Sequence, residues 1–217
     1  MRAAAATQRG KVARKESKEV RRQQLIEATI DSLARRGYAD TTTALVADGA
    51  GLSRGIVNFH FDSKEKLLIE TLRYLSDEYR TFWRTALKKA GPSPAEKLRA
   101  LVLADFDRKV CTPRKLAAWC AFWGEAKSRP TYQRLCGAND REYQFTVLNL
   151  CRGLADAHQS PELLARALVC LLEGLWLHLM MSPKEITSAD ARAVVLAHLG
   201  SVFPTQFTSD GDVRGQP

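Results

Sequence analysis

The chain has 217 residues, of which 45% are hydrophobic and 26% charged, and these values exclude a disordered or membrane-embedded protein. Its formal net charge of +9 favours a polyanionic partner such as nucleic acid, because lysine and arginine neutralise phosphates. The first 22 residues hold eight lysines or arginines against two glutamates, so we expect residues 1–18 to form a disordered basic arm.

The first helix is predicted over residues 18–36, because apolar residues recur at three- and four-residue steps and Gly37 supplies a stop signal. Asp62 and Glu65 have the spacing of a capping box, which predicts the start of a long helix that ends near Lys89. Further helix starts are predicted at Ser93-Pro94, Thr112-Pro113, Pro130, Ser160-Pro161 and Thr187.

No segment has the alternation of a strand, so the sequence predicts an all-α fold of about nine helices. The last helix is expected to end near Phe203, and the polar residues 204–217 are expected to form a disordered tail. We expect a DNA-binding head over residues 19–66 and a larger helical body over residues 67–203.

Residues 42–61 have the pattern of two short helices joined by a tight turn, as in a helix-turn-helix. Thr42 and Ser53 are placed to cap the two helices, and Gly51 permits the turn between them. The residues that the second helix would present to a major groove are Arg54, Gly55 and Asn58.

The run from Thr42 to Leu68, with Ala-Gly-Leu-Ser at the turn and Lys64-Glu65 at the next helix start, resembles the TetR family. The resemblance implies a dimeric repressor that binds a near-palindromic double-stranded operator and is released by a small effector. It also implies that Phe59 and Phe61 pack the head against the fourth helix. The residues expected to contact DNA are Thr42, Thr43, Ser53, Arg54, Gly55, Asn58, Phe59, His60 and Lys64. Thr43, Asp48-Gly49 and Phe59 depart from the usual family residues, which bears on the operator sequence.

Two segments of the body, residues 118–123 and 173–177, resemble the BetI subgroup, the choline-responsive repressors of glycine betaine synthesis. This similarity spans about residues 20–203. Choline is a quaternary ammonium, and such cations are held over aromatic faces. The residues expected to bind it are Trp119, Phe122, Trp123, Tyr132, Glu173 and Trp176. The competing interpretation is that aromatic side chains at this helical spacing only fill a core.

The helix over residues 161–181 and the last helix are predicted to pair with their copies in a homodimer. The first of these is apolar, but it carries Arg166, Glu173 and His178, which are costly in lipid, so we expect no membrane partner. The start of the chain lacks the apolar segment of a secretory signal, which favours a cytoplasmic protein.

The five cysteines are odd in number and lack C-x-x-C spacing, so buried, reduced thiols are expected. A repressor that senses oxidants through Cys111, Cys120 or Cys136 is an alternative, as is one that answers to a different apolar or cationic ligand. An architectural DNA-binding protein without a ligand is a third. Because no G-x-S-x-G, phosphate-binding loop or H-E-x-x-H occurs, we expect no enzyme, catalytic residue, metal site or cofactor.

Overall fold

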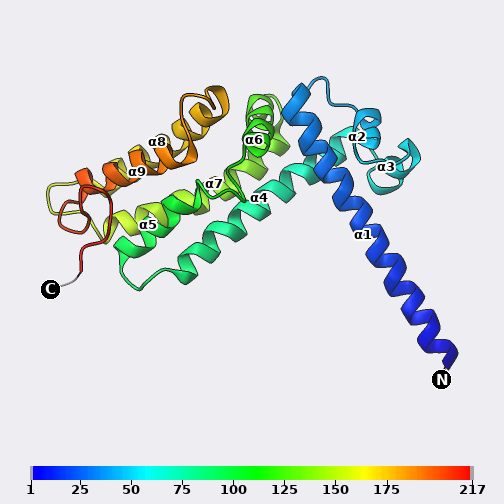
Figure 1. Ribbon diagram of the computed structural model, residues 1–217, viewed down its shortest axis with the longest axis horizontal. Coiled ribbons are helices and arrows are strands. Elements are labelled where there is room, and N and C mark those ends of the chain that lie inside the picture. Colours follow the sequence, from blue (N-terminus) through cyan, green and yellow to red (C-terminus); the bar gives the residue numbers. More distant parts are fainter. Residues whose placement is uncertain (1, 216–217) are drawn as a thin grey trace.

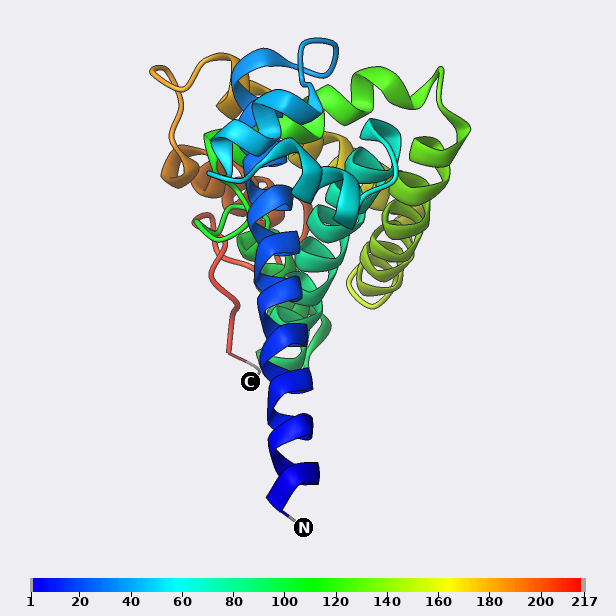
Figure 2. The ribbon, with the colours of Figure 1, turned by 90° about the vertical axis from the view of Figure 1, so that its right-hand side faces the viewer.

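The computed structural model describes residues 2–215, and the side chains of residues 17–137 and 140–215. Within these residues the chain forms nine helices and no strand, apart from one isolated bridge between Phe207 and Val213. The predicted all-α fold of about nine helices is confirmed. A small head lies at one end of an elongated body (Figures 1 and 2).

The head consists of the first three helices, packed against the first turns of the fourth. Their bounds are α1 (Arg2–Arg36), α2 (Thr43–Gly49), α3 (Arg54–His60) and α4 (Lys64–Lys89). Apolar side chains at helical spacing form the core of the head: Leu25, Ile26, Ile30, Leu33, Val46, Ala47 and Val57. Gly37 and Gly51 have φ values of +75° and +65°, so both turns require the left-handed conformation that glycine adopts without strain.

The body is built around α4, which runs from the head along the molecule (Figure 1). It is completed by α5 (Pro94–Ala104), α6 (Pro113–Ala126), α7 (Pro130–Arg152), α8 (Pro161–Met181) and α9 (Ser188–Val202). The helix α6 packs against both α8 in the body and α1 in the head. It therefore connects the two parts of the molecule.

Most of the expected helix starts are present. Ser93 with Glu96 and Thr187 with Asp190 form complete capping boxes, and Thr112 and Ser160 cap the helices that begin with a proline. The start of α4 differs by one residue: Ser63 is the N-cap and its hydroxyl accepts from the Lys66 amide, so Asp62 and Glu65 do not form the expected box. Serine and aspartate are equally good N-cap residues, so the shift of the helix start by one residue costs no capping interaction.

The basic arm differs from expectation, because α1 begins at Arg2 and continues through the segment predicted to be disordered. Figure 1 shows this half of α1 extending away from the head. Alanine, lysine and arginine favour helix, and a helix that tertiary packing has already nucleated is readily extended. Met1 lies outside the described residues.

The C-terminal segment also differs, because residues 204–215 fold back onto α5 and α9. Phe207 is fully buried, and its backbone pairs with Val213. Arg99 of α5 donates to the Gly211 carbonyl at 3.0 Å and to the Asp212 carboxylate at 2.8 Å. One buried aromatic side chain thus orders a segment whose polar composition predicted disorder; residues 216–217 lie outside the described part.

Candidate functional site

The outer face of α3 is exposed to solvent. Arg54, Gly55 and Asn58 all lie on it, while Val57 of the same helix is buried in the head core. Ser53 is the exposed N-cap of α3, and its hydroxyl accepts no capping hydrogen bond. The helix therefore presents polar side chains and a free hydroxyl on one surface, as a major-groove reader requires.

The start of α2 lies beside this surface. Thr42 is exposed and its hydroxyl caps the helix, accepting from the Leu45 amide at 3.3 Å. Thr43, the next residue, is half-buried. The two short helices pack against each other, and each has exposed polar residues.

The two aromatic residues at the end of α3 lie in different environments. Phe61 is 2% exposed and packs inside, whereas Phe59 is 68% exposed, so the expectation that both pack the head against α4 holds for Phe61 alone. Phe59 lies within α3, whereas Phe61 is the C-cap and has an extended backbone, with φ −140° and ψ 120°, so the two side chains do not follow one helical face. The Lys18 ammonium group of α1 lies 5.4 Å from the Phe59 ring centroid. The exposed Phe59 ring therefore contacts α1 through Lys18, at the basic side of that helix.

His60 is half-buried between the rings of Phe59 and Phe61, at centroid distances of 5.2 and 6.4 Å. Burial, followed by the positive charges of Lys18 and its neighbours on α1, lowers the pKa of this imidazole below 6.5. Its Nδ1 atom has no hydrogen-bond partner within the described part of the chain. A neutral ring at neutral pH is therefore placed beside the basic face.

Lys64 is engaged within the protein. Its ammonium group donates to the carbonyls of Tyr38 and Ala39 at 3.5 and 3.3 Å, and it lies 5.6 Å from the Tyr38 ring centroid. The side chain ties the start of α4 to the turn after α1. Its position in the head thus has a structural reason besides the phosphate contact expected from the motif.

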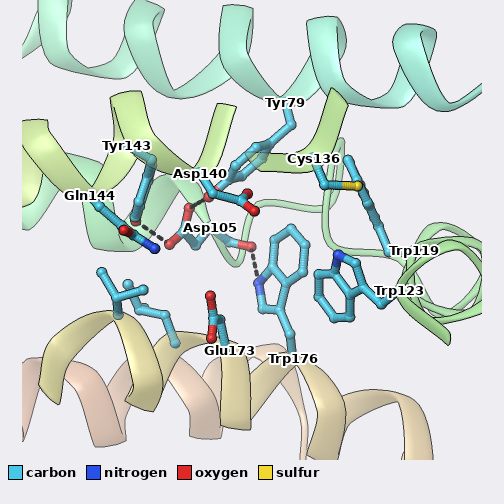
Figure 3. Close-up of a pocket in the computed structure, with 12 residues that line it drawn as sticks. Tyr79, Asp105, Trp119, Trp123, Cys136, Asp140, Tyr143, Gln144, Glu173 and Trp176 are labelled. Atoms are coloured by element: carbon cyan, nitrogen blue, oxygen red, sulfur yellow. Dashed lines mark hydrogen bonds between the residues drawn. The ribbon is translucent and has the colours of Figure 1, made fainter. Parts of the chain in front are cut away.

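The body contains a pocket between α4, α6, α7 and α8, which Figure 3 shows in close-up. Its cavity volume is about 70 Å³, which is below the roughly 300–1,000 Å³ of typical small-molecule pockets, so its lining and not its size marks it as a candidate site. Four of the six residues predicted to bind ligand line it: Trp119, Trp123, Glu173 and Trp176. The Trp119 and Trp123 rings lie 6.1 Å apart, and we call the whole site the aromatic pocket.

Eight further lining residues were not expected from the sequence, and four of them carry a carboxyl or phenol group: Tyr79, Asp105, Asp140 and Tyr143. Asp105 is 2% exposed and follows directly after α5. Its two carboxylate oxygens accept hydrogen bonds from the Tyr79 and Tyr143 hydroxyls at 2.7 and 2.5 Å. The Trp176 indole donates to the Asp105 carbonyl at 3.0 Å, which holds the ring against the pocket wall.

Three carboxyl groups thus line the aromatic pocket, and the described residues that line it include no lysine or arginine. Burial raises the pKa of Asp105 to about 7, although the two tyrosine hydroxyls oppose this shift. Desolvation, with the Glu173 charge as a second cause, raises the pKa of Asp140 to about 6. Such a site favours a positively charged ligand and disfavours an anion.

The other two predicted ligand residues, Phe122 and Tyr132, lie outside this pocket, between the body and the head. The Tyr132 hydroxyl is hydrogen-bonded to that of Tyr38 at 2.8 Å, and the Phe122 ring packs on both tyrosines, at 5.6 Å from Tyr132 and 6.5 Å from Tyr38. Helical spacing brings Phe122 close to Trp119 and Trp123 along the chain but does not decide what each side chain faces. We call Tyr38, Phe122 and Tyr132 the head–body junction.

Ion pairs surround this junction. Arg129, at the start of α7, pairs with Glu125 of α6 and Glu65 of α4 at 3.0 and 3.2 Å. Arg114, at the start of α6, pairs with Glu27 and Asp31 of α1, both at 2.5 Å. The helix that carries two tryptophans of the aromatic pocket is therefore fastened to the head near both of its ends.

Large apolar side chains of α8 and α9 are exposed, and we call them the apolar face of these helices. They are Leu163, Leu177 and Met181 of α8, which are 67, 50 and 69% exposed, and Val194 of α9, which is 45% exposed. Among the helices of the described residues, α8 alone is long and apolar enough to span a membrane. The other side of α8 packs on α6, α7 and α9. The apolar composition of this helix therefore comes from core residues on one side and from the exposed apolar residues on the other.

Three of the five cysteines are buried, as predicted. Cys111, Cys136 and Cys151 lie in the core, and burial raises the pKa of each thiol to about 11. Cys120 is half-buried, and Cys170 is exposed on α8, contrary to expectation. A thiol with so high a pKa is rarely ionised and reacts slowly with oxidants, which disfavours the buried cysteines as sensors.

A helix-turn-helix head joined to an all-helical body with a pocket lined by aromatic side chains defines the class of helical one-component regulators. The profile of the tetR family of bacterial regulatory proteins matches residues 25–71, and that of the BetI-type transcriptional repressor C-terminal domain matches residues 94–204. The chain therefore belongs to the TetR family, in its BetI-type branch.

Similar curated proteins cover most of the chain. The transcriptional regulator BetI 1 of Chromohalobacter salexigens is 34% identical over 80% of this chain and 85% of its own length. BetI of Burkholderia thailandensis is 38% identical over 74% of this chain and 82% of its own length. These relatives are transcriptional regulators and not enzymes.

Solved structures show the same fold. A transcriptional regulator from Pseudomonas aeruginosa has a TM-score of 0.73 and 29% identity, with 86% of this chain and 91% of that chain covered. One from Saccharomonospora viridis, solved in complex with choline, has a TM-score of 0.73 and 21% identity, with 82% of this chain and 94% of that chain covered. At the second identity the likeness concerns the fold alone.

Proposed function

We propose that this protein is a dimeric repressor that binds a near-palindromic operator in the cytoplasm and is released by a small quaternary ammonium such as choline. The observation that carries the choice of ligand is the aromatic pocket, where three tryptophans lie beside three carboxyl groups. A quaternary ammonium donates no hydrogen bond, so aromatic faces and negative charge are the groups that recognise it. The choline complex of the Saccharomonospora viridis protein, which has the same fold, supports this choice.

The exposed apolar face of α8 and α9 supports the dimer. Leu163, Leu177 and Met181 would be buried against a second copy, as in a four-helix interface. A two-fold axis through this face would present the two α3 helices to successive major grooves. The face extends over two helices, so we place the partner subunit there and not a lipid surface.

The position of α6 supports the coupling between ligand and DNA. Trp119 and Trp123 lie in the aromatic pocket, while Phe122 and Arg114 of the same helix contact the head. A ligand that binds more tightly to one position of α6 increases the population with that position. Because α6 contacts the head, the population of head orientations changes with it. The ligand-bound population would then have a head spacing that does not fit the operator.

The test of this function uses choline and its neutral isostere 3,3-dimethylbutan-1-ol, which has the same shape without the charge. We expect isothermal titration to detect choline and not the isostere, and choline to release the protein from its own upstream DNA in gel retardation. Trp119→Ala and Trp176→Ala should lose choline binding, whereas the exposed Phe145→Ala should keep it. Equal binding of the isostere would show an apolar effector site and contradict the proposal.

The thiol-sensing alternative has a separate test. Peroxide should leave DNA binding unchanged, because burial raises the thiol pKa of each cysteine named in this alternative, Cys111, Cys120 and Cys136. Release of DNA by peroxide from the wild type, but not from a Cys→Ser variant, would favour the redox sensor.

A further inference from the structure

Asp105 occupies an unusual position for a carboxyl group. It is 2% exposed, and both of its oxygens are held by tyrosine hydroxyls, Tyr79 from α4 and Tyr143 from α7. It also lines the aromatic pocket, beside the indole of Trp176 (Figure 3). A buried carboxylate without a cation beside it is costly, so such a group needs a reason to be there.

No salt bridge to Asp105 occurs within the part of the chain that the structure describes. Arg192 of α9 donates to the carbonyl of Phe106, the residue after Asp105, at 2.9 Å, and its Nε atom is buried without a hydrogen-bond partner among the described residues. Arg141 acts on Asp140. The position opposite Asp105 that a counter-ion would occupy is the pocket itself.

We propose that Asp105, held by Tyr79 and Tyr143, is the counter-ion for the cationic group of the effector, and that its carboxyl group releases a proton to solvent when the cation binds. This inference rests on the proposed function and adds to it a chemical consequence. The O–H bond of the neutral acid breaks, the proton passes to buffer, and the carboxylate that remains faces the ligand cation across the pocket. Repulsion from the same carboxylate would exclude ligands that carry a negative charge near this end.

The physical cause is the balance between burial and charge. Burial raises the pKa of Asp105 to about 7 in the empty protein, so a large share of the carboxyl groups is neutral under mildly acidic conditions. A bound cation favours the ionised form and lowers this pKa. Below the pKa of the empty protein and above that of the complex, binding therefore releases up to about one proton, and affinity rises up to about tenfold per pH unit. At higher pH both states are ionised, and affinity becomes independent of pH.

Other groups that face Asp105 titrate outside this window or in its lower part. The pKa values of Tyr79 and Tyr143 are raised well above 10 by burial, so both remain hydroxyl donors. Burial raises the pKa of the Cys111 thiol to about 11. Across the pocket, Asp140 has a pKa of about 6, and desolvation also raises the pKa of Glu173. Asp140 interacts with Glu173, whereas the shift of Asp105 comes from burial, so Asp105 alone titrates in the upper part of this range.

The test is isothermal titration of the full-length protein with choline chloride, in buffers of different ionisation enthalpy, at about pH 6 and about pH 8.5. The difference between buffers counts protons, and we expect release of about one proton at the lower pH and almost none at the higher. In Asp105→Asn the release at about pH 6 should fall to the share that Asp140 and Glu173 contribute, and the affinity should become independent of pH above about pH 7. Asp140→Asn is the matched control, because it removes another carboxyl group of the pocket but keeps Asp105. The proton release that Asp105 causes should therefore remain.

Tyr143→Phe covers the case in which Asp105→Asn does not fold. It removes one hydroxyl that stabilises the carboxylate, so the rise of affinity with pH should move to higher pH while choline still binds. Choline binding without proton release at either pH, or an unchanged profile in both variants, would overturn the counter-ion role and leave the effector proposal standing. Absence of choline binding at every pH would overturn the effector proposal itself.

Discussion

At the scale of single residues, Arg54 and Lys64 differ although both were expected to contact DNA. Arg54 is exposed on α3, and we expect Arg54→Ala to weaken binding to the operator about 5- to 150-fold, the equivalent of about 1–3 kcal/mol for a base contact. Binding to unrelated DNA should change much less. Fluorescence anisotropy with operator and scrambled duplexes measures both, and Lys89→Ala, at the far end of α4, is the charge-matched control. Equal weakening on both duplexes would show that Arg54 contacts DNA phosphates and not bases.

Lys64→Ala should behave differently, because this side chain also binds the carbonyls of Tyr38 and Ala39. We expect a lower melting temperature in addition to weaker, sequence-independent DNA binding with a shallower salt dependence. Thermal unfolding of the variant beside Lys89→Ala separates the two effects. An unchanged melting temperature would show that the contacts to the turn after α1 contribute nothing to the stability of the head.

The residues of the head could be placed from the sequence because the motif is local. Thr42, Gly51 and Ser53 lie within a dozen residues, and capping and turn chemistry alone assign their positions. The pocket is different, since Asp105 and Tyr143 are 38 residues apart and meet only through the packing of α4, α5 and α7. No spacing rule along one helix identifies such a pair.

At the scale of helices, α6 joins the aromatic pocket to the head–body junction. Tyr132→Phe removes the hydrogen bond between the Tyr132 and Tyr38 hydroxyls while it keeps both rings. We expect choline affinity to change little, and the choline-induced loss of operator affinity to fall about two- to tenfold, in line with about 1 kcal/mol for one hydrogen bond.

A double-mutant cycle with Tyr38→Phe provides the control for this prediction. Both variants remove this bond, and Tyr38→Phe also removes the hydrogen bond from the Tyr38 hydroxyl to Glu65 at 3.4 Å, so the double variant should show the same coupling as Tyr38→Phe alone. Additive losses in the double variant would show that the two hydroxyls act separately. The sequence could not assign this role to Tyr132, because it lies 94 residues from Tyr38 along the chain.

The C-terminal segment belongs to the same scale, since it packs on α5 and α9 instead of forming a disordered tail. Phe207 is fully buried, and Phe207→Ala should cost about 3–5 kcal/mol of unfolding free energy, because it leaves a cavity. Urea unfolding followed by circular dichroism measures this loss. Thr205→Ala, at an exposed position of the same segment, should change little. The single aromatic residue was the signal for order that the polar composition obscured.

At the scale of the whole molecule, the apolar face of α8 and α9 is the dimer interface that we propose. A charged side chain at its centre would be buried without a partner, so Leu177→Arg should convert the dimer to monomers. Light scattering after size-exclusion chromatography measures the mass. The monomer should also bind operator DNA more weakly and lose the contact with the second half-site.

Phe145→Arg is the matched control, because Phe145 is 62% exposed on α7, outside this face. It should remain a dimer with normal operator affinity. Dissociation of this variant, with Leu177→Arg still dimeric, would place the interface on α7 and require a different spacing of the two heads.

Three of the chain's four tryptophans line the aromatic pocket. The fourth, Trp83, is buried with its ring 5.7 Å from that of Tyr143, a residue of the same pocket. Nearly all of the native indole emission therefore originates within or next to the place where an effector would sit. An unlabelled sample in a fluorimeter should thus report occupancy directly, and a plate of candidate metabolites can be screened by quenching before any DNA is added.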